Sequence, residues 1–446
     1  MGAPGINIPI TPVPRYQGAN AQGTNGDVSL SNSNEYAYLV DVGIGGQTFE
    51  VLLDTGSSDL WVVSSNCTTQ DCAEVPKFDT TDTANLTLSG AAFHLGYLLG
   101  SVTGSIVADT VALGSYEVSS QVLALANGTS GLDLSGTGYS GILGLTFPAE
   151  ASIAGTYGQT FIDNVFASLD EDDRFFAYKL GRNKTDSSFA IGQLDPTYAN
   201  SSSNFTYIPV SSAGTNDGQY NFWKVPLQYI TINSTRFDLS KTSVSGASTN
   251  IGILDTGTTL LLGPSADVER FWQSVGNTRN TDSGWQVRCN RAAIVGFVLG
   301  DGDDQQEFVL DPADVNWEPG SQQDGWCMGG IQANDGVFSG DWLLGDTFLR
   351  NVYAVHHAAT NASSPRIGLL GMTDPTAALA QFRAVRGDDT TAPGQVHSRA
   401  PRSTQLTGAD VCGVAVVCGF VFGVILALLL HIWLEPRSRG RKIIRY

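Results

Sequence analysis

The sequence predicts a mostly β protein that is built from two similar lobes, related by a pseudo-twofold axis, and followed by one transmembrane helix. Three observations carry this prediction: a turn-rich composition, a short motif that occurs twice in the same context, and one long uncharged segment near the end of the chain. The matching elements of the two lobes are expected to meet at the axis between them.

The composition favours strands and turns over helices. Of 446 residues, 51 are glycine and only 15 % are charged, well below the usual ~25 %. The formal net charge of −19 argues against nucleic acid as a partner, because phosphate binding needs a basic face. The acidity fits a protein that works in acid, where carboxylates titrate, and it equally fits a requirement for solubility alone.

Secondary structure can be read from short segments. Runs of β-branched or aromatic residues bounded by Gly, Asn or Ser indicate strands, as at 36–44, 49–54, 105–113 and 176–180. Apolar spacing indicates helices at 161–169 and 265–275.

The order along the chain follows from composition shifts. We expect a polar leader over 1–32, an N-terminal β lobe over 33–205 and a C-terminal β lobe over 206–372. Residues 373–410, rich in Ala, Thr, Pro, Gly and Arg, are expected to form a flexible stalk.

The segment Val411 to Leu434 is the candidate transmembrane helix. Its 24 residues carry no charge, and at ~1.5 Å per residue they can span a ~30 Å hydrocarbon core. The tail 435–446 is basic, so the positive-inside rule places it in the cytoplasm and the remaining chain in the lumen or outside the cell. The sequence therefore predicts a lipid bilayer as one partner.

The start of the chain does not fit this orientation directly. No basic region followed by an apolar region is visible there, so a tail-anchored protein with a cytosolic body is the alternative. The cysteines and sequons favour the secretory pathway, with the plasma membrane or the vacuole and endosomal system as destination.

Four cysteines lie outside the uncharged segment. Cys67 and Cys72 are five residues apart, Cys289 and Cys327 are 38 apart, and none has a zinc-ligand spacing. We expect no metal and two disulfides, one local and one closing a longer loop. Glycosylation sequons begin at Asn85, Asn127, Asn183, Asn200, Asn204, Asn233 and Asn361, and a further one at Asn66 has Cys67 as its middle residue.

The repeated motif is Asp-Thr-Gly. It occurs at 54–56 and 255–257, each time behind an apolar run and ahead of two hydroxyl residues. Ninety residues after Asp54 comes Gly144 in GILGL, and ninety residues after Asp255 comes Gly345 in WLLGD. This equal spacing indicates a duplication.

Two aspartates brought together by such a duplication have a defined chemistry. Carboxylates within a few Å of each other cannot both ionise easily, so they share a proton. The ionised group can activate a water, while the protonated group polarises a carbonyl and later protonates a leaving nitrogen. This is chemistry for amide hydrolysis, and it needs no metal, cofactor or covalent nucleophile.

Over roughly Glu35 to Met372 the sequence resembles the pepsin-like aspartic proteases. Asp54 in DTGSSDLWV and Asp255 in DTGTTLLLGP match the two catalytic motifs of that family. YLLGSVTG, beginning at Tyr97, resembles its flap hairpin, and Trp61 matches the tryptophan that pairs with the flap tyrosine.

The resemblance implies a bilobal, monomeric endopeptidase that cleaves polypeptides in a cleft between the lobes. Asp54 and Asp255 would hold the lytic water, and Thr55 and Thr256 would brace the two loops. Substrate and carboxylate contacts would come from Gly56, Gly257, Ser57, Thr258 and Tyr97. The pairs Cys67–Cys72 and Cys289–Cys327 fit the family's disulfide positions.

The chain departs from the family pattern at two places. Leu98 stands where the family has Gly after the flap tyrosine, and His356-His357 stand where it often has Phe-Asp. Adjacent strand residues face opposite sides, so the two histidines are not expected to bind one metal. A catalytically inactive peptide- or glycan-binding receptor on the same scaffold is the alternative function, against which the intact triplets argue.

Overall fold

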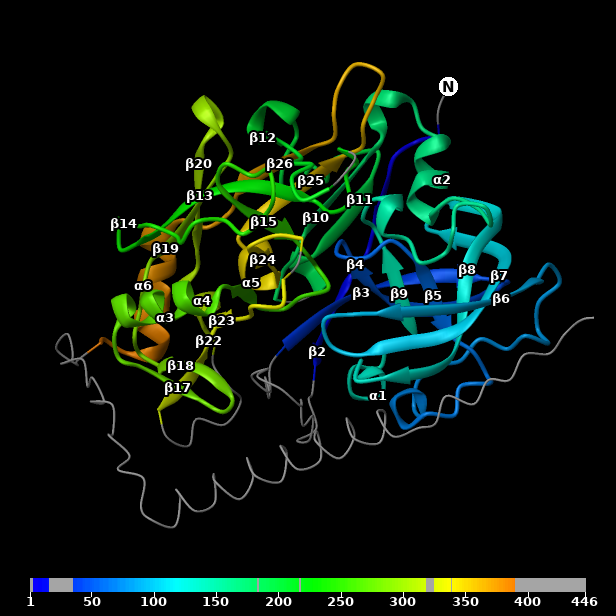
Figure 1. Cartoon of the computed structure of the whole chain (residues 1–446), viewed down its shortest axis with the longest axis horizontal. Helices are drawn as coiled ribbons and strands as arrows, with labels where there is room; N and C mark the ends of the chain where they lie inside the picture. Colours follow the sequence, from blue (N-terminus) through cyan, green and yellow to red (C-terminus); the bar gives the residue numbers. More distant parts are fainter. Residues whose placement is uncertain are drawn as a thin grey trace, which may run out of the picture. The chain divides into compact units, whose positions relative to one another are not determined.

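The computed structural model describes residues 3–15, 35–182, 184–215, 218–317, 325–337 and 339–389. Within these ranges the chain is mostly β structure, arranged in four sheets (Figure 1). No helix in the described ranges is long and apolar enough to cross a membrane. The predicted transmembrane segment 411–434, the basic tail 435–446 and Asn183 lie outside the described residues.

The first half of the chain forms one eight-stranded sheet. Its order is β2 (Thr11–Arg15), β3 (Glu35–Ile44), β4 (Gln47–Asp54), β9 (Gly141–Gly144), β5 (Leu60–Val63), β8 (Tyr116–Ser130), β7 (Ser101–Leu113) and β6 (Thr87–Gly96). The sheet contains the runs 36–44, 49–54 and 105–113, so these strand predictions are confirmed.

The second half forms a corresponding eight-stranded sheet and a smaller one. The larger sheet has the order β20 (Gln306–Leu310), β19 (Val295–Leu299), β13 (Lys224–Ile232), β15 (Asn250–Leu254), β24 (Trp342–Leu344), β16 (Leu261–Gly263) and β23 (Ile331–Ala333), with β14 (Thr235–Phe237) beside β13. The four-stranded sheet has the order β17 (Thr278–Thr281), β18 (Gly284–Arg288), β22 (Trp326–Gly329) and β21 (Asn316–Trp317).

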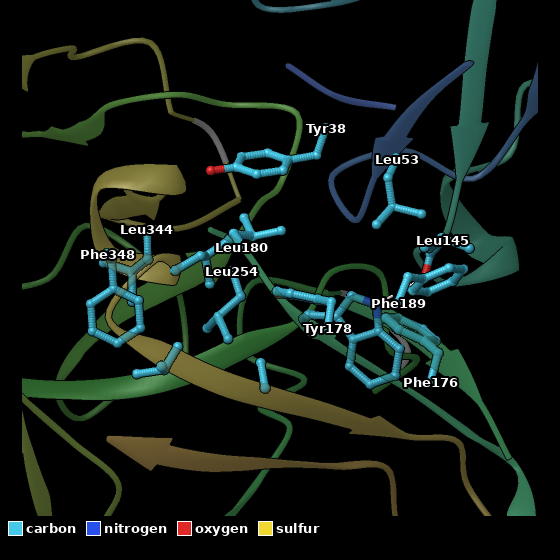
Figure 2. Close-up of a cluster of buried hydrophobic side chains, with 14 of the residues drawn as sticks. Tyr38, Leu53, Leu145, Phe176, Tyr178, Leu180, Phe189, Leu254, Leu344 and Phe348 are labelled. Atoms are coloured by element: carbon cyan, nitrogen blue, oxygen red, sulfur yellow. Dashed lines mark hydrogen bonds between the residues drawn. The ribbon is translucent and has the colours of Figure 1, made fainter. Parts of the chain in front are cut away.

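A six-stranded sheet combines strands of both halves. Its order is β1 (Ile6–Ile8), β11 (Ser188–Ile191), β10 (Phe175–Lys179), β25 (Val352–His357), β26 (Arg366–Gly371) and β12 (Thr206–Pro209). Phe176 and Tyr178 of β10 belong to one buried cluster with Leu53 of β4 and Leu254 of β15, part of which Figure 2 shows. The ends of the two strands that carry the Asp-Thr-Gly triplets therefore share a core with this sheet.

The helices in the described ranges are short. They are α1 (Leu134–Thr137), α2 (Phe161–Ala167), α3 (Ser265–Val275), α4 (Pro312–Val315), α5 (Asp346–Leu349) and α6 (Pro375–Arg386). Single 3-10 turns occur at Gln70–Cys72, Pro148–Glu150, Glu171–Asp173, Lys184–Asp186, Ser202–Asn204 and Gly302–Asp304. Helices α2 and α3 confirm the two helix predictions.

The predicted polar leader over 1–32 is wrong for the residues that the structure describes. Ile6 to Ile8 pair antiparallel with β11, and β2 pairs with β3. Ile8 and Ile10 are buried, so an apolar residue at every second position makes this segment a strand at the edge of a sheet. The Pro and Gly residues around it obscured that pattern.

The predicted flexible stalk over 373–410 is wrong for 375–386, which form α6. The Asp374 carboxylate accepts hydrogen bonds from the backbone N–H groups of Thr376 and Ala377, and Pro375 occupies the first helical position. Ala378 and Phe382, one turn apart, are buried. The helix is amphipathic and capped, but its Ala, Thr and Pro content resembles that of a linker.

Candidate active site

The two Asp-Thr-Gly triplets occupy equivalent places in the two large sheets. Asp54 ends β4, which runs parallel to β9 with Asp54 opposite Gly144. Asp255 directly follows β15, which runs parallel to β24 with Leu254 opposite Leu344, so that Gly345 comes next. The ninety-residue spacing in each half is therefore the distance along the chain between two adjacent parallel strands.

Gly144 and Gly345 make room for the loops that follow the aspartates. A Cβ on Gly144 would lie 2.5 Å from the carbonyl carbon of Ser58, and one on Gly345 would lie 2.1 Å from the carbonyl oxygen of Thr258. Both distances are too short for non-bonded atoms, so a side chain at either glycine would displace a triplet loop. This close packing explains why both halves carry glycine there.

Each aspartate is held by the same two hydrogen bonds. Asp54 Oδ1 accepts from Gly56 N at 2.8 Å, and its Oδ2 accepts from Ser57 Oγ at 2.5 Å. In the other half, Asp255 Oδ1 accepts from the N–H of the second residue after it at 2.8 Å, and its Oδ2 accepts from Thr258 Oγ1 at 2.6 Å. The hydroxyl residue after each triplet thus fixes the carboxylate rotamer, as the resemblance implied.

The two threonines of the triplets join the loops to each other. Thr55 N donates to Thr256 Oγ1, and Thr256 N donates to Thr55 Oγ1, both at 3.0 Å. Each hydroxyl then donates across the axis, from Thr55 to Leu254 O at 3.0 Å and from Thr256 to Leu53 O at 2.6 Å. All four hydrogen bonds are buried and link residues about 200 positions apart in sequence.

The glycines of the triplets bring the two carboxylates close together. A Cβ on Gly56 would lie 2.5 Å from Asp255 Oδ1, and a Cβ on Gly257 would lie 2.5 Å from Asp54 Oδ1. Each glycine therefore packs against the carboxylate of the other triplet, where no larger residue fits. Asp54 and Asp255 are both buried.

This environment favours a shared proton. Burial, and next the negative charge of Asp255, raise the pKa of Asp54 to about 7, and the hydrogen bonds from Ser57 and Gly56 oppose the shift without cancelling it. An ordinary Asp titrates near ~3.9, so the pair retains a proton over a pH range in which an isolated Asp would have lost it. The site can therefore present an acid and a base side by side.

The predicted flap is the hairpin of β6 and β7. Tyr97 OH accepts a hydrogen bond from Trp61 Nε1 at 2.7 Å, and Tyr97 N donates to Gly100 O at 2.9 Å. Burial and the nearby charge of Asp54 raise the pKa of Tyr97 well above its ordinary value, so it remains a phenol. Leu98 and Leu99 at the tip are 48 % and 57 % exposed.

Gly100 lies in the turn of the flap hairpin, between β6 and β7, and packs against the end of β8. Its φ is +92°, in the left-handed region, and a Cβ there would lie 2.3 Å from the carbonyl oxygen of Ser130. The tip therefore approaches the end of β8 at a point where only glycine fits.

The two histidines lie on opposite faces of β25, as expected for adjacent strand residues. His356 is fully buried and stacks on Phe176 at 4.8 Å, with the Trp223 ring edge-on at 4.7 Å. Within the described ranges neither ring nitrogen of His356 has a hydrogen-bond partner, and burial lowers its pKa well below the ordinary value. His357 packs against Phe175 at 4.8 Å.

Two residues near the site were missed as positioning groups. The buried Asp59 carboxylate accepts from Ser152 N at 2.7 Å and from Ile153 N at 3.1 Å, which ties the loop after β9 to the first triplet loop. Trp223 Nε1 donates to Leu145 O at 2.9 Å, and Trp223 O accepts from Leu254 N at 3.0 Å. For Asp59 the sequence offered one signal: the matching position of the second motif is a leucine, so the aspartate is not part of the repeat.

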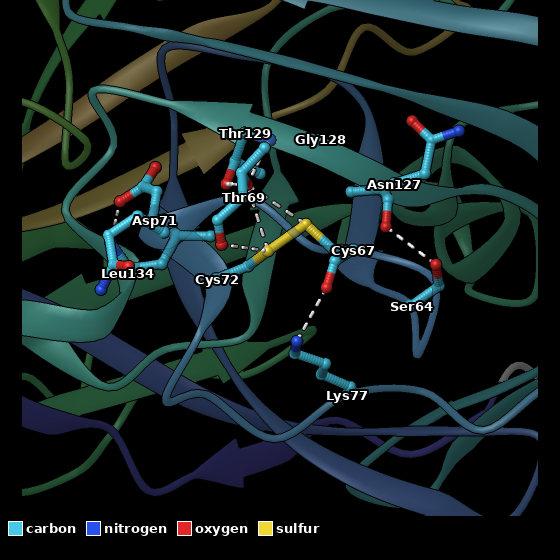
Figure 3. Close-up of a disulfide and its surroundings, with 12 residues drawn as sticks. Ser64, Cys67, Thr69, Asp71, Cys72, Lys77, Asn127, Gly128, Thr129 and Leu134 are labelled. Atoms are coloured by element: carbon cyan, nitrogen blue, oxygen red, sulfur yellow. Dashed lines mark hydrogen bonds between the residues drawn. A yellow bond between two sulfur atoms is a disulfide. The ribbon is translucent and has the colours of Figure 1, made fainter.

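Both expected disulfides are present, Cys67–Cys72 and Cys289–Cys327. The first closes a small loop beside the end of β8, drawn in Figure 3. Among the described sequons, the exposed asparagines are Asn66, Asn85, Asn127, Asn200, Asn204, Asn233 and Asn361.

A duplicated β fold with two buried aspartates held side by side defines an aspartic-type endopeptidase. Residues 35–369 match the family model of the eukaryotic aspartyl proteases, and the chain belongs to this family. It is 29 % identical to pepsin A of Sus scrofa over 344 residues, covering 75 % of this chain and 82 % of that protein. It is 29 % identical to chymosin of Camelus dromedarius over 337 residues, covering 75 % and 80 %. It is also 28 % identical to major aspartyl peptidase 1 of Cryptococcus neoformans over 362 residues, covering 76 % and 71 %.

Proposed function

We propose that this endopeptidase hydrolyses polypeptides with Asp54 and Asp255 as its catalytic pair, works best in acid, and is anchored to a membrane of the secretory pathway. The observation that carries the catalytic part is the symmetric support of the two carboxylates, each held by a backbone N–H and a hydroxyl. A water shared by the two aspartates needs both carboxylates to be held in fixed positions, and these hydrogen bonds hold them.

In the proposed reaction one carboxyl is protonated and the other ionised. The ionised group takes a proton from a water whose oxygen attacks the peptide carbonyl carbon, while the protonated group gives its proton to the carbonyl oxygen. The resulting gem-diol collapses when one carboxyl protonates the amide nitrogen and the other takes a hydroxyl proton. The C–N bond breaks, an acid and an amine leave, and the pair again holds one proton.

The neighbouring residues have supporting roles in this proposal. Ser57 and Thr258 orient the carboxylates, and Gly56 and Gly257 let a substrate strand approach them closely. Tyr97, held by Trp61, covers the bound peptide and excludes water, which strengthens electrostatic interactions in the site.

Membrane anchoring rests on sequence features. The uncharged segment 411–434 followed by the basic tail 435–446 supports a single span with a cytoplasmic end. The sequons and the two disulfides support a lumenal or extracellular body. In a microsomal membrane preparation washed with alkaline carbonate, the full chain should stay in the pellet, and a chain ending at residue 394 should be released.

The catalytic assignment is tested with peptide-cleavage assays across pH. Asp54→Asn and Asp255→Asn should each lower kcat by about 10²–10⁴-fold or more, because each removes a general acid or base. Asp82→Asn, at an exposed aspartate, is the matched control and should cleave like the unmodified chain. Wild-type rates in both variants would overturn the assignment, and binding of a statine-type inhibitor without any turnover would favour the receptor alternative.

A further inference from the structure

Two glycosylation sequons meet at the small disulfide loop of the first half. Asn66-Cys67-Thr68 contains one of the bonded cysteines, and Asn127-Gly128-Thr129 lies on β8 directly across from the loop (Figure 3). They are more than sixty residues apart in sequence, so only the fold brings them to the same disulfide.

The disulfide loop buries the hydroxyl residue of the second sequon. Thr129 is only 5 % exposed, although Asn127 is exposed. Thr129 N donates to Thr69 Oγ1 at 3.2 Å, and the two hydroxyls share a hydrogen bond at 3.3 Å. Thr69 Oγ1 also lies 3.4 Å and 3.2 Å from the sulfurs of Cys67 and Cys72. The closed loop therefore holds the hydroxyl on which the sequon depends.

The first sequon is locked at its middle residue. Asn66 and Thr68 are exposed, but Cys67 is 1 % exposed and bonded to Cys72. Cys67 N donates to Ser64 O at 2.9 Å, and Cys67 O accepts from Lys77 Nζ at 2.8 Å. Asn66 is thereby held in a tight turn that cannot extend while the disulfide is closed.

A glycosyltransferase needs the asparagine amide and the hydroxyl two residues later on one accessible stretch of chain. We propose that closure of the Cys67–Cys72 disulfide ends the period in which Asn66 and Asn127 can be N-glycosylated, so that the timing of this oxidation sets their occupancy. This inference rests on the secretory placement proposed above. The exposed asparagine side chains leave room for a glycan in the folded chain. The constraint is therefore that glycosylation must come before disulfide closure, and not that a glycan is too large for the folded protein.

Both steps are ordinary lumenal chemistry. In glycosylation, Asn Nδ2 bonds to the anomeric carbon of a lipid-linked oligosaccharide and loses a proton, and the lipid pyrophosphate leaves. In closure, two thiols lose two protons and two electrons to a dithiol–disulfide oxidant. The glycan at Asn127 would stand beside the flap hairpin, because Thr103 of β7 donates to Asn127 Oδ1 at 3.4 Å.

The test is site occupancy in the full chain, directed into the secretory pathway of a eukaryotic host and measured by mass spectrometry of glycopeptides. Cys72→Ser opens the loop without altering either sequon, and Cys327→Ser opens the other disulfide as the matched control. Asn85 serves as the internal reference, because it and its sequon threonine, Thr87, are both exposed. Occupancy is measured on total cellular chain, so the result does not depend on whether a variant folds.

We expect occupancy at Asn66 and Asn127 to lie below that at Asn85 in the unmodified chain and to rise at least twofold in Cys72→Ser, but not in Cys327→Ser. A brief pulse of reductant during synthesis should raise both sites in the unmodified chain in the same way. Unchanged occupancy in Cys72→Ser, with Asn85 glycosylated, overturns the inference while leaving the secretory placement intact. Absence of glycan at every site, Asn85 included, overturns both.

Discussion

Thr55 and Thr256 exchange hydrogen bonds across the two halves of the chain, each donating its backbone N–H to the other's hydroxyl at 3.0 Å. The same hydroxyls donate to the carbonyls that precede the opposite aspartate. The relative position of Asp54 and Asp255 is therefore set by four buried hydrogen bonds and not by the sheets alone.

Removing one of these hydroxyls should weaken folding and catalysis together. Thr256→Ala leaves Thr55 N and the Leu53 carbonyl buried without their partner, at about 1–3 kcal/mol each, so the free energy of unfolding should fall by about 2–6 kcal/mol. Thr256→Ser keeps the hydroxyl and is the control. Denaturant titrations and kcat measure the two effects, and equal stability of the Ala and Ser variants would contradict this account.

The alkaline limit of activity should follow the proton shared by the pair. The raised pKa of Asp54, about 7, means that the proton is present below that pH and is lost as pH rises through it, so kcat/KM should decline there. Ser57→Ala removes a hydrogen bond that lowers this pKa, and the decline should move to higher pH. Ser58→Ala, whose hydroxyl bonds to Phe147 O instead, should leave the pH profile in place.

Buried His356 and partly buried His357 should make the fold sensitive to acid. His356 has a folded-state pKa well below its ordinary value and His357 one of about 4, both mainly through burial, so below ~6.5 the unfolded chain binds protons that the folded chain does not. Each can cost up to about 1.4 kcal/mol per pH unit as pH falls below that value.

The variant His356→Phe should accordingly lose less stability than the unmodified chain when the pH falls from 7.5 to 5. Thermal unfolding of both proteins at the two pH values measures this difference. His94→Gln, at an exposed histidine, is the control and should leave the difference between the two pH values unchanged. Identical pH dependence in His356→Phe and the unmodified chain would contradict a role of His356 in acid sensitivity.

The triplet glycines should tolerate no side chain. In Gly56→Ala the new Cβ would lie 2.5 Å from Asp255 Oδ1, so the two carboxylates must move apart and cleavage should be lost. Gly155→Ala adds the same methyl group where no heavy atom beyond the two neighbouring residues lies within 4 Å, and it should keep full activity. Comparing kcat for the two folded variants decides the point.

Helix α6 should contribute to the stability of the body that precedes it. Phe382→Ala removes a side chain that is 3 % exposed, at a cost of about 3–5 kcal/mol. Val385→Ala, on the same helix but 72 % exposed, should change the free energy of unfolding by less than about 0.5 kcal/mol. If both variants unfold alike in denaturant, α6 does not pack as described.

The features that were predicted correctly are those whose signal lies within one short segment of the sequence. Helices α2 and α3 carry their own apolar spacing, and the triplets carry both the aspartate and the hydroxyl that orients it. The equal spacing to Gly144 and Gly345 could be seen without knowing that parallel strands cause it.

The errors fall where the deciding contact is distant in sequence. Ile6 is a strand residue because it pairs with Ile191, and nothing within the first 32 residues reveals that partner. The segment of α6 is low in complexity, so composition predicted a linker, and only the burial of Phe382 makes it part of the body. Asp59 was missed because its two partners come from the backbone of Ser152 and Ile153, which any residue could supply.

The docking of α6 also has a mechanical consequence. Arg386 Nη1 donates to Asn316 O at 2.6 Å, Asn290 Nδ2 donates to Asp388 O at 3.1 Å, and Arg291 pairs with Asp389 at 2.5 Å. These contacts surround Cys289, whose disulfide to Cys327 closes the adjoining loop. A tensile load on the chain beyond residue 389 would therefore be borne first by this cross-linked corner. β26 and the six-stranded sheet beneath the aspartates would be spared that load.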